Sequence, residues 1–397
     1  MRILVLNADY PRFLSWLYRS QPGLGSAGYA AQMTARNASL FGVADFYSRN
    51  FAALGHSAAE IHVNNAWLQT AWAREHGMTV AAAAPAAPSG STALPAWLQR
   101  AVTPLKPMLR PLARKVGLSP SLDPQAEAIL LAQIEDFRPD VVLNQDTFHV
   151  DPALMRRIKA IGNPILIGQI GIAPSRGVDW SVYDLMMSQL STTVEFFRRL
   201  GVRAEVNHLA FEPAILDVLP PAPEMDIHVS FVGTVSPDHR QRIALLEAVA
   251  RRYDLKLFGN PPQALPASSP LHQCFQGEVW GADMYQTLRR SMITLNSHID
   301  MAGSEAGNMR LFEATGVGAF LLTDFKDNLN TLFEPDDEVA TWRSIDDCLA
   351  TIASADVDDD IRAGIAVAGQ ARTMAHHTYR HRAAEILGFV EKLRTPR

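Results

Sequence analysis

The chain has 397 residues, of which 48% are hydrophobic and 19% are charged. This composition excludes wholesale disorder, and the length predicts two or three domains. The 41 Asp and Glu residues outnumber the 36 Lys and Arg residues, which argues against nucleic acid as the main partner. Two cysteines, Cys274 and Cys348, cannot form a disulfide framework or a cysteine zinc site, so we expect a reducing compartment.

The sequence contains no stretch typical of a targeting segment or a membrane span. Near the N-terminus, the apolar run at residues 3–6 is followed by the polar residues Asn7 and Asp9. A secretory segment needs an apolar stretch of about 7–15 residues, and a membrane span needs about 20. We therefore expect a soluble cytoplasmic protein.

Short apolar runs that end in polar or turn residues predict strands. Because these runs do not alternate with polar residues, they are typical of strands buried on both faces of a parallel sheet. Helical stretches lie between them: Asp123 and Asp151 each precede a proline as helix caps, and Gly201 ends a helix. The pattern predicts doubly wound α/β domains. The predicted strands are residues 3–7, 141–144, 165–169, 227–233, 255–259, 292–296 and 320–323.

Two segments interrupt this alternation of strands and helices. The first segment, which begins at residue 80, is rich in Ala and Pro. The second segment, residues 219–226, contains three prolines, which restrict the backbone and favour a semi-rigid linker. We predict an N-terminal domain at residues 1–218 with an insertion at 80–120, a linker at 219–226, a C-terminal domain at 227–378 and a final helix at 379–397.

Three segments resemble known ligand-binding or metal-binding motifs, but a purely structural role explains each of them more simply. Residues 23–28 have G-x-G-x-x-G spacing, but about fifteen residues separate them from the first strand, so a surface loop is favoured over a dinucleotide site. The acidic run at 356–360 resembles a D-x-D metal clamp, although acidic residues also favour a helix start. His376, His377 and His381 are interpreted as a polar helix start. We therefore expect no metal site.

The charged residues between Glu75 and Asp123 are all basic, and they interleave with apolar residues. A solvated helical insertion packed on the first domain is the favoured interpretation. The alternative is a patch that contacts a membrane surface or an anionic acceptor.

Residues 304–318 carry the side chains best suited to chemistry. They lie between the predicted strands 292–296 and 320–323. Glu305 falls in a loop at the carboxyl end of a strand, where open parallel sheets bind ligands. Gly307 and Asn308 would place backbone N–H groups at a helix N-terminus, which attracts phosphate.

Further polar residues extend this candidate site. Arg310 provides a guanidinium group that can bind a diphosphate with two hydrogen bonds. Glu313, further along the predicted helix, can accept hydrogen bonds from the vicinal hydroxyls of a sugar. Asn296 and His298 stand at the end of the preceding strand and in the loop after it, and we include them in the site.

These residues resemble a known family. Glu305 and Glu313, with seven residues between them and a Gly-rich turn after them, resemble the donor-site motif of GT-B glycosyltransferases related to family 4. The wider pattern, which is specific over residues 227–394, is similar to that of the CgeB-like glycosyltransferases. The segments that carry the resemblance are residues 2–6, 230–234, 308–314, 318–324 and 332–335.

The resemblance implies two Rossmann-like domains whose parallel sheets face each other across a cleft, with a nucleotide-sugar held mostly by the second domain. It places Glu313 at the ribose hydroxyls and Glu305 near the transferred sugar. It places Gly233 and Thr234 beside the diphosphate.

The resemblance also implies basic diphosphate ligands after that turn. Arg240 and Arg242 follow it, but no lysine lies nearby in the sequence, so we expect Arg310 to share this role. In the first domain, Asp146 and His149 follow a predicted strand. They are candidates to contact sugar or acceptor, or to act as a general base if the reaction inverts. An Asx-turn with a surface histidine is an equal alternative.

The predicted function is a glycosyltransferase that moves a sugar from a nucleotide-sugar to an unidentified acceptor, namely a polysaccharide, a lipid-linked sugar or a protein. The resemblance implies retention of configuration and no cofactor. Helix N-termini and guanidinium groups can stabilise the leaving diphosphate, so no metal is expected. The alternatives are a nucleotide-sugar epimerase of the same fold and a non-catalytic two-domain sugar-binding protein.

Overall fold

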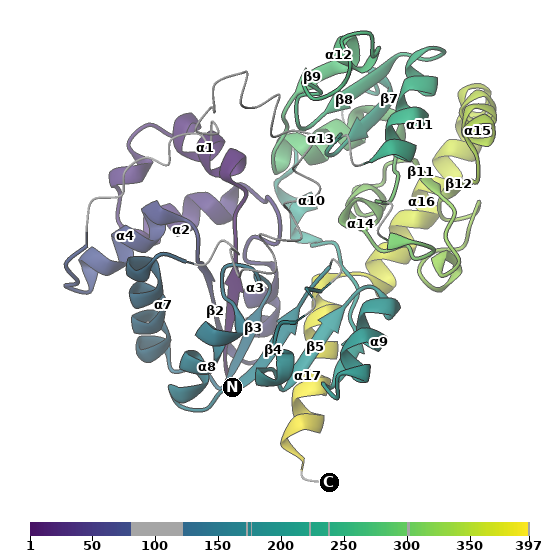
Figure 1. Cartoon of the computed structure of the whole chain (residues 1–397). Coiled ribbons are helices and arrows are strands. Elements are labelled where there is room, and N and C mark those ends of the chain that lie inside the picture. Colours follow the sequence, from purple (N-terminus) through teal and green to yellow (C-terminus); the bar gives the residue numbers. More distant parts are fainter. Residues whose placement is uncertain are drawn as a thin grey trace. The chain divides into compact units, whose positions relative to one another are not determined.

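The computed structural model describes residues 1–80, 122–171, 174–175, 177–221, 224–236, 239–299 and 302–395 (Figure 1). The predicted Ala/Pro-rich insertion, with its basic and apolar residues, lies outside the described residues from residue 81 onwards.

Contacts divide the chain into two compact units. The first comprises Met1–Ser188, Thr192–Glu205 and Val390–Arg397, and the second comprises Gln189–Ser191 and Val206–Phe389. Residues 219–226, which the sequence predicts as a linker, are grouped with the second unit.

The first unit contains a six-stranded sheet with the order β2-β1-β3-β4-β5-β6. Neighbouring strands from β2 to β5 pair in parallel. The strand order reverses between β1 and β3, so the carboxyl ends of these two strands flank the switch point of the sheet. The strands are β1 (Arg2–Asn7), β2 (Ser57–His62), β3 (Val141–Asn144), β4 (Ile165–Gln169), β5 (Leu185–Ser188) and β6 (Ala204–Val206).

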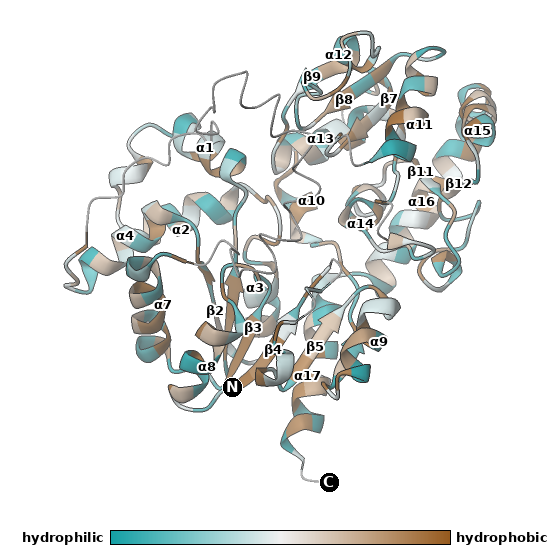
Figure 2. Cartoon of the chain, viewed as in Figure 1, coloured by the Kyte–Doolittle hydropathy of each residue, from teal (hydrophilic) through white to brown (hydrophobic). Residues whose placement is uncertain are grey.

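Both faces of this sheet are buried. Successive side chains of a strand point to opposite faces, yet Ile3, Leu4, Val5 and Leu6 of β1 are all at most 1% exposed. Leu4 and Leu6 belong to a core shared with α7 (Pro124–Phe137), α8 (Pro152–Ala160) and α9 (Ser191–Arg199). In Figure 2, β3, β4 and β5 are correspondingly brown, whereas α8 and α9 also carry teal residues. The prediction of strands buried on both faces is confirmed.

Local capping signals in the first unit form as predicted. The side chain of Asp123 accepts a hydrogen bond from Ala126 N at the start of α7, and Asp151 accepts from Leu154 N at the start of α8. Residues 23–28, predicted as a loop, instead contain a short 3₁₀ helix and lead directly into α2. The other helices of this unit are α1 (Pro11–Ser20), η1 (Leu24–Ser26), α2 (Tyr29–Ala38), α3 (Phe46–Ala53), α4 (Ala66–Glu75) and η3 (Trp180–Val182).

The second unit contains a parallel six-stranded sheet with the order β12-β11-β10-β7-β8-β9. Its strand order reverses between β7 and β10. The strands are β7 (Ile227–Val232), β8 (Leu255–Phe258), β9 (Phe275–Gly277), β10 (Ser291–Leu295), β11 (Leu321–Asp324) and β12 (Ala340–Trp342). All seven strands predicted from the sequence are therefore present in the two sheets, with ends shifted by at most one residue.

Helices cover this second sheet. Val229, Phe231, Ile293 and Leu295 pack in one core with residues of α11 and α15. The helices of the second half of the chain are α10 (Ala214–Val218), α11 (Arg240–Ala250), α12 (Leu271–Cys274), α13 (Ala282–Arg290), α14 (Met309–Gly316), η5 (Leu329–Thr331), α15 (Ile345–Val357), α16 (Asp359–His376) and α17 (Tyr379–Arg394), the last of which is grouped with the first unit from Val390 onwards.

The acidic run at residues 356–360 caps helices. Asp358 accepts a hydrogen bond from Ile361 N at 2.9 Å, and Asp356 lies 2.7 Å from His228 Nε2. The histidines differ from the polar helix start that the sequence predicts, because His377 is buried with its Nε2 atom 2.8 Å from Leu332 O. Across the described ranges, no three His, Cys, Asp or Glu side chains form a group that could hold a metal ion. In the same ranges, no helix is long and apolar enough to cross a membrane.

We expect Gly259→Ala to destabilise the protein by about 2–5 kcal/mol. Gly259 follows β8 with a φ of 135°, and a Cβ atom there would lie 2.2 Å from the carbonyl oxygen of Gly233. Denaturant unfolding measures the change. The matched control is Gly277→Ala, which has a φ of 110° and no heavy atom within 4 Å of the added Cβ. Equal destabilisation by the two substitutions would mean that the contact with Gly233 is unimportant.

Candidate active site

The candidate residues of the second unit gather at the switch point of its sheet. Gly233 and Thr234 follow β7, whereas Asn296 and His298 follow β10. In open parallel sheets, ligands bind outside the carboxyl ends of the strands where the strand order reverses. The sequence placed these residues at strand ends, and the strand order places the two loops next to each other.

An asparagine pair holds the N-terminus of α14 at the end of β10. Asn308 Nδ2 donates to Asn296 Oδ1 at 2.8 Å, and Asn296 Nδ2 donates to Thr323 Oγ1 at 3.0 Å. Asn308 is also the N-cap of α14, since its Oδ1 atom accepts from Leu311 N at 3.3 Å. The first turn of a helix leaves backbone N–H groups without partners inside the helix, and these attract anions.

His298 connects two neighbouring loops. Its Nε2 atom accepts a hydrogen bond from Gly307 N at 3.1 Å, so its proton lies on Nδ1, which is 2.7 Å from Asp324 Oδ1. Burial raises the pKa of Asp324, but the hydrogen bonds from His298 and the charge of Lys326 together lower it below the usual value. The amide of Gly307 is therefore engaged by His298, so a phosphate at this helix start would have to be bound by amides of the first turn of α14.

Arg310 and Glu313 form an ion pair on α14. Arg310 Nη1 lies 2.9 Å from Glu313 Oε2, and Arg310 Nε donates to Val232 O at 3.2 Å, at the end of β7. Glu313 is 6% exposed; burial raises its pKa, against the opposing charge of Arg310. A guanidinium group and a buried carboxylate thus lie side by side at the switch point.

Glu305 is buried in the loop before α14. Its Oε2 atom accepts a hydrogen bond from Ser191 N at 2.6 Å. The loop is held by Asn328, which accepts from Ala306 N at 2.6 Å and donates to Ala306 O at 3.1 Å. Glu305 is therefore held in one orientation.

The two arginines after β7 have different surroundings. Arg242 is buried and donates to Thr234 O at 2.8 Å and to Ser297 O at 2.6 Å, so it joins the loops after β7 and β10. Arg240 is exposed at the first residue of α11 and forms no ion pair with the described part of the chain. Of these two arginines, Arg240 is the one that is exposed to solvent.

Asp146 and His149 lie in the first unit, whereas the other candidate residues lie in the second. They follow β3, at the switch point of the first sheet. Asn144 Oδ1 accepts from Asp146 N at 2.9 Å, which is the predicted Asx-turn, and Asp146 Oδ2 lies 2.7 Å from His149 Nδ1. The hydrogen bond from Asp146 raises the pKa of His149 above 6.5.

Sequence reasoning did not identify Asp324 and Asn328. Asp324 is the last residue of β11, directly after a predicted strand, so its position at the carboxyl edge of the sheet was the available signal. Asn328 has no comparable signal, because its role depends on a loop 22 residues earlier in the chain.

The second unit therefore combines a helix N-terminus, a guanidinium group and buried carboxylates at the switch point of a parallel sheet. These groups suit a ligand that has both phosphate and vicinal hydroxyl groups.

Residues 240–388 match the model of a family described as glycosyl transferase-like. No curated protein matches the chain significantly in sequence.

Solved structures match nearly the whole chain. Sucrose-phosphate synthase from Thermosynechococcus elongatus has 11% identity and a TM-score of 0.54, with 99% of both chains covered. HepE from Anabaena, in complex with UDP-glucose, has 14% identity and a TM-score of 0.56, with 99% of this chain and 100% of HepE covered. A glycosyltransferase from Rickettsia africae has 9% identity and a TM-score of 0.56, with 99% and 98% covered.

The fold is the GT-B fold of glycosyltransferases, with a parallel-sheet α/β arrangement in each half, as the sequence predicted. The family match over the second half, together with these neighbours, supports a glycosyltransferase as the class of enzyme.

Proposed function

We propose that the protein transfers a sugar from a nucleoside diphosphate sugar to the hydroxyl group of an acceptor. The observation that carries this proposal is the Arg310–Glu313 pair on the first turns of α14, at the carboxyl ends of β7 and β10. HepE was solved in complex with UDP-glucose, which supports a uridine nucleotide as the first donor to test.

In this proposal, Glu313 binds the ribose hydroxyls, and the first turn of α14 binds the diphosphate together with Arg310 and Arg240. The C1–O bond of the sugar breaks, and the electron pair leaves with the nucleoside diphosphate. The acceptor oxygen bonds to C1, and its proton passes to the leaving oxygen of the nucleoside diphosphate. Developing charge on the leaving oxygen is stabilised by the helix N-terminus and the guanidinium groups, and one such donor is typically worth about 3 kcal/mol.

Further details follow the family resemblance. We propose transfer with retention, without a divalent metal or a cofactor, in the cytoplasm, by a protein of the CgeB-like group related to family 4. Glu305 contacts the transferred sugar, while Asp146 and His149 of the first unit act on the acceptor side. The buried, fixed carboxylate of Glu305 supports its role.

The test is donor binding followed by turnover. Calorimetry with UDP, UDP-glucose and other nucleoside diphosphate sugars is expected to give saturable binding, and purified protein is expected to release UDP slowly from the preferred donor. NMR of the product separates transfer or hydrolysis from epimerisation. Turnover should persist in EDTA. Failure of every nucleoside diphosphate to bind the folded protein at millimolar concentration would refute the proposal.

A further inference from the structure

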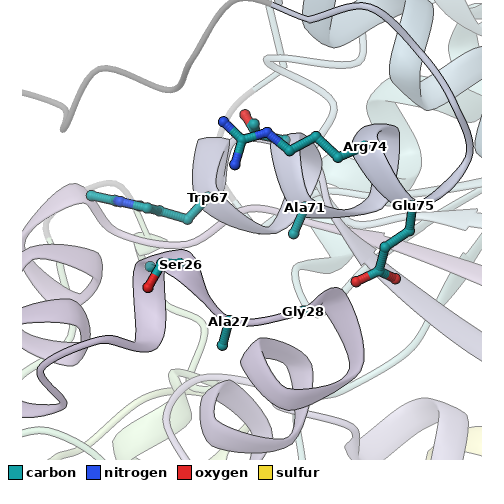
Figure 3. A pocket seen from close by; sticks show the side chains of 9 residues that line it. Ser26, Ala27, Gly28, Trp67, Ala71, Arg74 and Glu75 are labelled. Atoms are coloured by element: carbon teal, nitrogen blue, oxygen red, sulfur yellow. The ribbon is translucent and has the colours of Figure 1, made fainter.

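A cavity of about 260 Å³ lies within the first unit, between α4 and the segment of residues 25–28 (Figure 3). This segment contains the G-x-G-x-x-G spacing that the donor site does not use. Glu75 Oε1 accepts a hydrogen bond from Tyr29 N at 2.7 Å, at the first residue of α2. Because a protein carboxylate occupies this helix start, the motif does not serve as a pyrophosphate site here.

The glycines instead allow the two walls of the cavity to approach each other. A Cβ atom at Gly25 would lie 2.9 Å from Trp67 Cδ1, and one at Gly28 would lie 2.9 Å from Glu75 Oε1. Figure 3 shows Trp67, Ala71, Arg74 and Glu75 on α4, opposite the segment that contains Gly28. The cavity therefore explains Gly25 and Gly28, the two glycines of the motif that line it.

One side of α4 presents polar groups that have no partner among the residues that the structure describes. Trp67, Thr70 and Arg74 line the cavity at helical spacing. The indole N–H of Trp67, the hydroxyl of Thr70 and the guanidinium of Arg74 form no hydrogen bond or ion pair with any residue that the structure describes. Thr70 is only 5% exposed, so a ligand in the cavity would supply the partner that water otherwise provides.

A buried polar network fixes the walls. The ring of Tyr18 stacks on Trp67 with centroids 4.1 Å apart, and Tyr18 Oη donates to Gln32 Oε1 at 2.8 Å. Gln32 is fully buried, and its Nε2 atom donates to Ala27 O at 2.8 Å on the opposite wall. Both walls are thus joined through Tyr18 and Gln32, and a preorganised cavity loses less entropy on binding.

We propose that this cavity binds one sugar ring that carries an anionic substituent, either a carboxylate or a phosphate. Its volume lies just below the range of about 300–1,000 Å³ for small-molecule pockets, which suits a single ring. Arg74 supplies the cation for the anionic group. Thr70, the indole N–H and the Glu75 carboxylate supply partners for ring hydroxyls.

This inference rests on the proposed function in one respect: in a glycosyltransferase, the ligand of this cavity is the acceptor or a part of it. The binding itself does not depend on the donor site, because every lining residue lies in the first unit.

Calorimetry or ligand-observed NMR on the full chain tests the proposal with glucuronate, glucose 6-phosphate, glucose and inorganic phosphate. At least one anionic sugar is expected to bind ten-fold or more tightly than glucose and than phosphate alone. Comparison of the two anionic sugars distinguishes a carboxylate from a phosphate substituent. Arg74→Gln should weaken the anionic sugar about ten-fold and remove its advantage over glucose, while Arg74→Lys should retain part of it.

The control Arg199→Gln makes the same change of charge at an exposed residue of α9 outside the cavity and should leave binding unchanged. The proposal is overturned if neither anionic sugar binds the folded protein, or if Arg74→Gln binds as the native chain does. UDP binding is measured in parallel. Sugar binding without UDP binding would refute the proposed function and support the cavity, and the reverse would refute only the cavity.

Discussion

Glu313→Gln is expected to raise the dissociation constants of UDP and of UDP-glucose by about 10- to 100-fold. In the proposed site, the Glu313 carboxylate accepts hydrogen bonds from the ribose, and hydrogen bonds to charged groups contribute about 1.5–3 kcal/mol. Because both ligands contain the ribose, both should lose affinity equally. A loss confined to UDP-glucose would place Glu313 at the sugar instead.

Gln is chosen because Arg310 lies beside Glu313. Glu313→Ala would leave a mostly buried guanidinium group without its partner, and lost stability would then obscure lost affinity. Gln keeps a polar oxygen at a similar place. The raised pKa of Glu313 means that its contribution to stability is complete below its unfolded pKa and declines as pH rises through the folded pKa. A neutral Gln should therefore be tolerated at pH 7.

Calorimetry at pH 7, with thermal unfolding as a check on folding, measures this effect. Glu334→Gln removes an exposed carboxylate from the same unit and should leave both dissociation constants unchanged. Native-like affinity in folded Glu313→Gln protein would contradict the assignment of Glu313 to the donor site.

His149→Gln is expected to lower kcat by about 10² with little change in the KM for the donor, since loss of a residue that orients a substrate can cost about 10²-fold. His149 and Asp146 form a hydrogen-bonded pair at the switch point of the first sheet. In a retaining transfer, the pair would fix the orientation of a hydroxyl group of the acceptor or of the sugar. Steady-state kinetics measures the change, and His272→Gln, an exposed histidine of the second unit, is the control.

The pH dependence tests whether the pair acts as a unit. Asp146→Asn removes the hydrogen bond that raises the pKa of His149, so this pKa should fall towards about 6.5 in an NMR titration. A raised histidine pKa contributes stability that is complete below the unfolded pKa and is lost as pH rises through the folded pKa. The free energy of unfolding of the native protein should therefore exceed that of the Asp146→Asn variant, and the difference should be largest below a pH of about 6.5. An unchanged kcat in either variant would leave the pair a purely structural role.

The strands predicted from the sequence are mostly buried on both faces; the exception is β8, in which every second residue is only partly buried. Residues such as those of β1 and β3 form short Val, Ile and Leu runs, because a central strand of a parallel sheet has no solvent-facing side. The edge strands β2, β6, β9 and β12 escaped prediction. The sequence of β2, SAAEIH, is buried only at its last two residues and carries no apolar run, so only its pairing with β1 makes it a strand.

β5 was missed for a different reason. Its four residues, LMMS, are all buried, but so short an apolar run has the same pattern as part of a buried helix. Pairing with β4 decides the conformation.

Helix caps and strand ends could be predicted from the sequence because they depend on residues that are close together in the chain. The side chains of Asp123, Asp151 and Asp358 each accept a hydrogen bond from the backbone N–H group three residues further along the chain. Over so short a separation, the chain can adopt few other conformations. For the same reason, the sequence located the polar residues that follow β7 and β10, and it placed Glu313 on a short helix.

Only the tertiary structure determined which of these residues meet. His298 pairs with Asp324, 26 residues away; Arg242 bonds Ser297 O, 55 residues away; and Glu305 accepts from Ser191 N, 114 residues away. These contacts depend on the order of strands in the sheets. That order is set by the burial of whole elements against one another, because no local preference of the backbone specifies which strand lies beside which.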